Sequence, residues 1–264
     1  MAFKLGDIIW DRLQYGYAES LDADAVPLYL LTQLQDATIN VTATSEDKTD
    51  AQGNLIKKVW KTKSGTLESQ NALINTNIIA AASGSDPVFA TSENKIVMPK
   101  IITVKAGASV TLADAVQGSV KVSEFVNGNS LGQTFEVSET ADETHFSITT
   151  AGVLTLPKAE NITKYAIKYQ RNVTDGVKIQ NRIDKFPKAV RLILKGLYFD
   201  PCEKNTLRGG YIELPSFQIS PEINIPIKTD ATMDYKGDLE IDYCADEKVL
   251  YNMYLAADDD EDEE

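Results

Sequence analysis

The chain has 264 residues, of which 43% are hydrophobic and 25% are charged, so it can build a core and wholesale disorder is disfavoured. Its formal net charge is −13, and the seven acids at positions 258–264 supply seven of these charges, which leaves a mildly acidic body. Such a surface repels nucleic-acid phosphate, so direct DNA binding is disfavoured as well. With no run of about 18 apolar residues and no signal peptide at its start, the sequence predicts a cytoplasmically made protein without a membrane span.

The first 66 residues predict an arm followed by two strands. Residues 1–35 carry short apolar clusters around an acidic loop, which indicates an arm that docks through small hydrophobic pieces. In 36–44 apolar and polar residues alternate strictly, and this predicts a strand with one buried face. The polar stretch 45–54 reads as a long hairpin loop with Gly53 as its turn former, and 55–66 returns as the second strand.

The period of the pattern changes at Leu67. Residues 67–83 contain a run of alanine, leucine and isoleucine that favours a helix. Ser69 is the predicted cap at its start and Gly84 the predicted cap at its end. We expect this to be the only substantial helix of the chain.

The middle of the chain predicts an inserted β module. Residues 96–173 contain short β-prone runs separated by turns, at the roughly 8–12-residue spacing of small sandwiches and barrels. We assign 100–165 to this module. Residues 1–99 and 166–257 then form one discontinuous β-sandwich domain, and 258–264 form an acidic disordered tail.

The last third predicts further antiparallel strands, so that the whole chain is mainly β, a sandwich or barrel with one flanking helix. Prolines lie within or beside these patterns and cannot donate to a ladder, so the strands that hold them should be edges or carry bulges. The prolines are Pro215, Pro221 and Pro226. The alternating apolar residues are Val190, Leu192 and Leu194, then Ile223, Ile225 and Ile227, then Leu239, Ile241 and Tyr243.

Residues and motifs suited to catalysis are scarce in this sequence. His145 is the only histidine and reads as a half-exposed strand residue. Cys202 and Cys244 are read as reduced thiols, although a cross-strand pair stays open. No glycine-rich phosphate loop and no metal-ligand spacing occurs. We therefore expect no enzyme, no catalytic residue, no cofactor and no metal.

Several phrases of the chain resemble tail tube proteins of tailed bacteriophages. The layout also resembles that family: strand, polar hairpin loop, strand, one helix, further strands and an inserted module. The phrases are Leu55–Lys61, Thr66–Leu73, Val173–Lys178, Asp184–Pro187 and Pro215–Pro221.

The resemblance implies a virion protein that assembles in the host cytoplasm. Its fold would be a β-sandwich or barrel flanked by one helix, with an Ig-like insertion that decorates the outer surface. Six copies would close a ring, and stacked rings would form a tail tube through which DNA passes without specific binding. The implied partners are further copies of the chain, together with tape-measure, tail terminator and sheath proteins.

The polar hairpin loop is the candidate contact between rings, because it could reach an adjacent ring and become ordered on contact. Its candidate residues are Glu46, Asp47, Lys48, Asp50, Gln52, Gly53 and Asn54. Three alternatives stay open: a capsid decoration or head-associated protein, a glycan-binding module, and an enzyme that would have to use His145.

Overall fold

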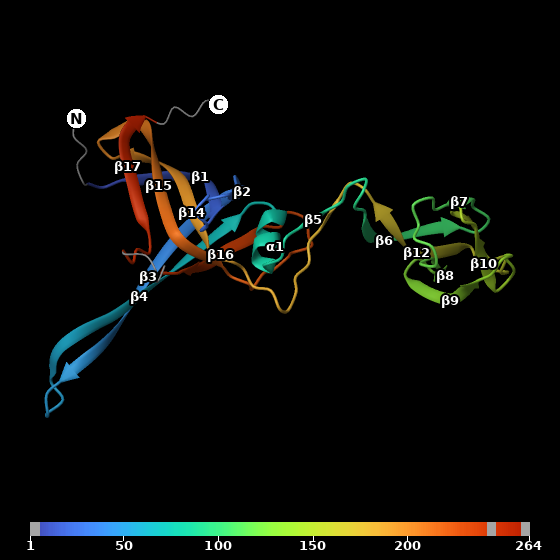
Figure 1. Ribbon diagram of the computed structural model, residues 1–264, viewed down its shortest axis with the longest axis horizontal. Coiled ribbons are helices and arrows are strands. Elements are labelled where there is room, and N and C mark those ends of the chain that lie inside the picture. Colours follow the sequence, from blue (N-terminus) through green and yellow to red (C-terminus); the bar gives the residue numbers. More distant parts are fainter. Residues whose placement is uncertain (1–5, 242–246, 260–264) are drawn as a thin grey trace. The chain divides into compact units, whose positions relative to one another are not determined.

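The protein is described by a computed structural model that covers residues 6–241 and 247–259 (Figure 1). The chain divides into two compact units, Met1–Asp86 with Ile179–Glu264, and Pro87–Lys178. Both units are β-structures, and α1 (Thr76–Ser83) is the one helix among the described residues. The predicted mainly β class with one flanking helix is confirmed.

The first unit is built on an eight-stranded sheet in the order β2-β1-β14-β15-β16-β4-β3, with β17 also paired to β15. The residues predicted as a docking arm are strands of this sheet, because β1 pairs with β14 over its whole length and with β2 near its end. The strands are β1 (Ile9–Ser20), β2 (Pro27–Leu31), β3 (Leu34–Thr49), β4 (Leu55–Asn71), β14 (Val190–Asp200), β15 (Glu203–Ile219), β16 (Met233–Leu239) and β17 (Asn252–Asp259).

The sheet curls around one hydrophobic core into a half-barrel. Val190, Leu192 and Leu194 are all buried, which confirms the alternation predicted for this strand. Ile78 and Ala82 of α1 pack into the same core, so the helix covers part of the concave face. The start of β3 lies against β1, since a Cβ on Gly16 would come within 2.8 Å of Leu34.

Pro215 marks the point where the sheet divides. The pairing of β15 with β14 shifts register between Leu214 and Phe217, so Pro215 lies in a bulge of a central strand. At the same point the other edge of β15 changes its partner from β17 to β16. A residue without an N–H fits where the ladder is interrupted, so the predicted bulge is confirmed for this proline.

The helix is shorter than predicted. It begins after Asn75, whose side chain accepts a hydrogen bond from the amide of Asn77 at 2.8 Å, and it ends at Gly84 as expected. Leu67 and Ser69 belong instead to β4 and point into the core. This part of β4 is paired on both edges, with β3 and β16, and that pairing overrides local helix propensity.

The predicted strand around Ile225 is absent from the described structure. Residues 221–228 pair with no strand, and Ile225 and Ile227 are 46% and 97% exposed. Pro221 and Pro226 supply no N–H to a ladder, which explains why alternation alone fails here. The alternation predicted from Leu239 onward begins where β16 ends, so Glu240 and Ile241 belong to no strand, and Tyr243 and Cys244 lie outside the described residues.

The second unit has its own core and a seven-stranded sheet in the order β6-β12-β8-β9-β10-β11-β7, plus the short pair β13-β5. It is wider than the predicted range 100–165, because β6 and β12 pair along their whole length. The strands are β5 (Val88–Phe89), β6 (Ile96–Lys105), β7 (Val110–Thr111), β8 (Lys121–Val126), β9 (Ser130–Val137), β10 (His145–Ile148), β11 (Val153–Thr155), β12 (Lys164–Val173) and β13 (Val177–Lys178).

The disordered tail was predicted to begin at residue 258, which is at least two residues too early. Asp258 and Asp259 are the last residues of β17, which pairs with β15. Residues 260–264 lie outside the described part of the chain.

Candidate assembly site

The hairpin of β3 and β4 extends away from the rest of its unit (Figure 1). β16 pairs with β4 only from Gly65 to Asn71, so residues 42–64 form a ribbon whose strands pair with each other alone. From Ser64 to Leu55 this ribbon spans about 30 Å at the usual rise of a strand. A two-stranded ribbon is at best marginally stable in water, so a partner surface would stabilise it.

The first half of the predicted assembly loop is strand. Glu46, Asp47 and Lys48 lie in β3, and only 50–54 form the turn. Cross-strand pairing therefore continues further than the polar composition suggested. Side-chain pairs support it, with Thr42 bonded to Ser64 at 2.9 Å and Thr44 to Thr62 at 2.8 Å.

Asp50 holds the turn together. Its carboxylate accepts hydrogen bonds from the amide of Gln52 and from both the amide and the side chain of Asn54, at 2.8–2.9 Å. These bonds, first among them that of the Asn54 side chain, lower the pKa of Asp50. Gly53 has a φ of 86°, a conformation that favours glycine, and its amide bonds to the Asp50 carbonyl. The predicted turn residues Asp50, Gln52, Gly53 and Asn54 thus form one compact motif.

The ribbon carries a net positive charge, although the whole chain is acidic. Residues 42–64 contain five lysines and three acids, a net charge of +2, whereas the whole chain carries −13. Glu46 is neutralised within the ribbon by Lys48 at 2.8 Å and by Lys61 at 2.7 Å, and these two lysines lower its pKa. Lys57 and Lys63 make no ion pair among the described residues.

The ribbon also exposes large apolar side chains. Ile56 is 68% exposed and Trp60 is 64% exposed. Lys58 and Trp60 lie on one face of β4, because they are two positions apart in a regularly paired stretch. The ammonium group of Lys58, on the same face, lies 5.7 Å from the centre of the Trp60 ring. An indole held out in solvent on a projecting ribbon has the chemistry of a binding anchor.

A groove of about 540 Å³ opens on the concave side of the half-barrel. β1 forms one wall and β3 the other, and among the described residues these two strands do not pair with each other. Trp10 lies at the groove over the paired glycines Gly196 and Gly210, where a Cβ would come within 2.8 Å and 2.7 Å of the indole. The groove is also lined by mostly apolar side chains, among them Leu13, Ile39, Val41, Ile212, Tyr251 and Met253.

The groove is a continuation of the core that no described element covers. Leu13, Ile39 and Ile212 pack against the core from the groove side and are only partly buried. Its rim carries an ion pair between Asp11 and Arg12 at 3.4 Å. A further carboxylate belongs to Asp36, which has no ion-pair or hydrogen-bond partner within the described residues.

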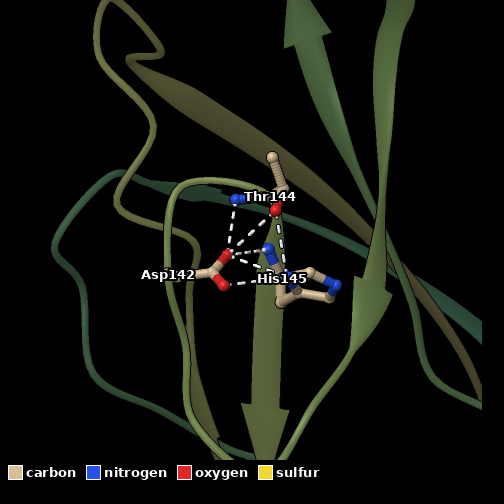
Figure 2. A network of polar contacts seen from close by, with 3 residues as sticks. All are labelled: Asp142, Thr144 and His145. Carbon is tan, nitrogen blue, oxygen red and sulfur yellow. Dashed lines mark hydrogen bonds and ion pairs between the residues drawn. The ribbon is translucent and has the colours of Figure 1, made fainter.

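The single histidine belongs to a local turn in the second unit (Figure 2). Asp142 accepts hydrogen bonds from the amides of Thr144 and His145 at 2.7 Å, and its carboxylate lies 2.9 Å from the imidazole Nδ1. These bonds, led by that of the Thr144 amide, lower the pKa of Asp142 to about 2. His145 begins β10 and is half-buried, as predicted. All three groups stabilise the entry into a strand, and none is among the residues that line the groove.

Metal binding and membrane insertion find little support among the described residues. No group of three or more metal-ligating side chains occurs among the described residues, and Cys202 is exposed and free. Cys244, its predicted alternative partner, lies outside the described part of the chain. None of the helices in the described ranges is long and apolar enough to cross a membrane.

The first unit is thus a mainly β half-barrel with one covering helix and a projecting ribbon. The sequence model of the YomU/Tube protein family matches residues 20–251, and the chain belongs to that family. It is accordingly a phage tube-type structural protein. The search of curated proteins found no match.

The groove and the anchor residues were not found from the sequence. Groove residues such as Trp10, Ile39 and Met253 come from three strands far apart in the chain, and no local pattern links them. Trp60 carried one usable signal, because it lies in a predicted strand among four lysines, Lys57, Lys58, Lys61 and Lys63.

Proposed function

We propose that this chain is the subunit of a phage tail tube, in which copies close into rings and the rings stack around a channel for DNA. The observation that supports this most directly is the ribbon of residues 42–64, which leaves its own unit and exposes Ile56 and Trp60. Such a ribbon is a liability in a monomer and a connector in a polymer.

The proposed ring is hexameric, and Glu46, Asp47, Lys48, Asp50, Gln52, Gly53 and Asn54 are its proposed contacts with the adjacent ring. The acidic body supports the role of a conduit, because a negative lining repels DNA phosphate and lets the duplex slide. Tape-measure, tail terminator and sheath proteins are the proposed partners, in the tail of the virion. The inserted unit, which we take to be Ig-like, would decorate the outer surface.

Electron microscopy of the purified chain at increasing concentration tests the assembly. We expect rings and hollow tubes. Deletion of Asp47–Gly53 should leave a folded monomer that does not polymerise, with circular dichroism as the check of its fold. Normal tubes from this deletion would remove the ribbon from the assembly mechanism, and stable monomers or trimers of the intact chain would favour a capsid decoration protein.

A further inference from the structure

The ribbon and the groove each lack a partner within one chain. The ribbon carries an exposed indole, that of Trp60, and an exposed isoleucine, Ile56. The groove has an apolar floor that continues the core, and its volume of about 540 Å³ has room for these two side chains. It lies within the range of roughly 300–1,000 Å³ typical of ligand sites.

One chain cannot satisfy both features by folding on itself. Val41 lies in the groove wall and also immediately precedes the ribbon. The turn at Asp50 is nine residues further along β3, about 30 Å away at the rise of a strand. The antiparallel ladder of β3 and β4 continues through this stretch and pairs Trp60 with Ser45, so neither the indole nor the tip can return to the groove of its own chain without breaking the ladder.

The opposite net charges of the ribbon and of the rest of the chain favour a second copy of the chain as the partner that supplies the ribbon to the groove. The ribbon has a net charge of +2, which leaves the rest of the chain at −15. At the groove rim Arg12 is neutralised by Asp11, and the Asp36 carboxylate is left to meet a cation. Lys58 stands beside Trp60 on the ribbon face, so an indole that enters the groove would bring an ammonium group to the rim with it.

We propose that the ribbon of one copy docks in the β1–β3 groove of the next, with Trp60 on its apolar floor and Lys58 near Asp36. This inference rests on the proposed self-assembly and names the surface that receives the ribbon. The contact is heterologous, because ribbon and groove are different patches of the same chain. Repetition of such a contact links copies in one direction and produces closed rings or open filaments.

Cross-linking between two differently labelled copies tests the contact. In a background with Cys202→Ser and Cys244→Ser, one preparation carries Ser45→Cys, at the position that pairs with Trp60 across the ribbon, and the other carries Met253→Cys, and the two are mixed with a short bis-maleimide. Ser45 is exposed and its replacement keeps the Trp60 indole, and Met253 is 47% exposed, so neither change removes a buried core side chain. We expect a covalent heterodimer as the main product.

Neighbouring positions on the opposite strand faces give matched controls. Lys61→Cys lies beside Trp60 on the other face of the ribbon. Tyr254→Cys lies beside Met253, and Tyr254 points away from the groove toward Glu213, to which its hydroxyl donates at 2.9 Å. Each control should give about ten-fold less product, in line with the loss of one specific contact. Equal yields from all combinations, or no product at all, would overturn the docking.

The same samples separate failure of the docking from failure of the proposed function. Tubes that form in the microscope without the selective cross-link would leave the tail-tube proposal standing and overturn the groove as the receptor. A chain that stays monomeric at every concentration would overturn both. In addition, Trp60→Ala should raise the concentration needed for assembly about 30-fold, as expected for the loss of a buried tryptophan anchor, while Lys57→Ala should change it little.

Discussion

The hydroxyl groups of Tyr29 and Tyr235 lie 3.1 Å apart and form a hydrogen bond across the core of the first unit. Tyr29 is on β2 and Tyr235 is on β16, and three strands separate these two in the sheet. These two hydroxyls can meet only because the sheet curls strongly. Burial raises the pKa of both hydroxyls, that of Tyr235 well above its usual value, because a phenolate would lose its hydration there.

Replacement of Tyr235 by phenylalanine should lower the free energy of unfolding by about 1–2 kcal/mol at pH 8, because the hydroxyl of Tyr29 loses its partner in a largely dry site. A tyrosine with a raised pKa stabilises the fold below about pH 10, and that stability is lost as the pH rises further, since the unfolded chain then ionises first. The deficit of Tyr235→Phe should accordingly shrink between pH 9 and pH 11.

Urea unfolding followed by tryptophan fluorescence measures this deficit, because Trp10 and Trp60 are the only tryptophans and both belong to the first unit. The exposed Tyr251 offers a control, and Tyr251→Phe should change neither the stability nor its pH dependence. A deficit that stays constant up to pH 11 would contradict the assignment of the alkaline titration to Tyr235.

Gly84 closes the helix against the backbone of Phe186. Its φ is 61°, and a Cβ there would lie 2.2 Å from the Phe186 carbonyl oxygen. Gly84→Ala should therefore destabilise the first unit by about 2–4 kcal/mol, from the left-handed conformation together with the forced backbone shift. Gly107 also has a positive φ, but an added Cβ would meet no neighbouring atom there. Gly107→Ala therefore measures the effect of the left-handed backbone conformation alone, and it should lower the free energy of unfolding by about 1 kcal/mol. Thermal melting by circular dichroism compares the two, and equal losses would show that the contact with Phe186 is not restrictive.

The sequence predicted the elements whose local pattern and tertiary setting agree. Val190, Leu192 and Leu194 alternate in sequence and are all buried, and Gly84 ends the helix in the expected left-handed conformation. The interpretation of Pro215 as a bulge succeeded for the same reason, because a missing N–H acts locally.

Predictions failed where a long-range pairing decided the outcome. Leu67 and Ser69 begin a stretch that favours a helix, yet pairing with strands on both sides makes it part of β4. Ile223, Ile225 and Ile227 alternate perfectly, yet they pair with no strand in the described structure. The groove could not be predicted either, because it exists only after the curl of the sheet brings β1 near β3.

The turn at Asp142 gives the inserted unit a pH-dependent element (Figure 2). Its pKa is lowered to about 2 from an ordinary value of 3.8, so its contribution to stability is present above pH 4 and is lost as the pH falls toward 2. Asp142→Ala should speed hydrogen exchange at the amides of Thr144 and His145 at pH 6. Asp142→Asn keeps an acceptor oxygen and should restore part of the protection.

Exchange measured by mass spectrometry on the intact protein distinguishes these variants. The difference between wild type and Asp142→Ala should disappear near pH 2, after correction for the intrinsic exchange rate. Equal protection in wild type and Asp142→Ala at pH 6 would mean that the strand β10 holds these amides without the carboxylate.

The turn at the ribbon tip offers a way to weaken assembly without unfolding the subunit. Asp50→Ala removes the acceptor of three hydrogen bonds, two of them from Asn54, but touches no core residue. The tip amides of Gln52 and Asn54 should exchange faster, while the urea midpoint of the first unit should stay unchanged, because the ribbon beyond Thr42 contributes nothing to the core. A frayed ribbon must be ordered again on docking, which should raise the concentration needed for tube formation roughly five-fold, or about 1 kcal/mol of ordering free energy.

Asp50→Asn is the matched variant, since it keeps one acceptor oxygen and should lie between wild type and Asp50→Ala in both exchange and assembly. The two readouts should move together across the three proteins, because a single property, the order of the tip, controls both. Faster exchange at the tip with an unchanged threshold for tube formation would show that the turn is not part of the contact, and that the ribbon engages its neighbour through the Trp60 face alone.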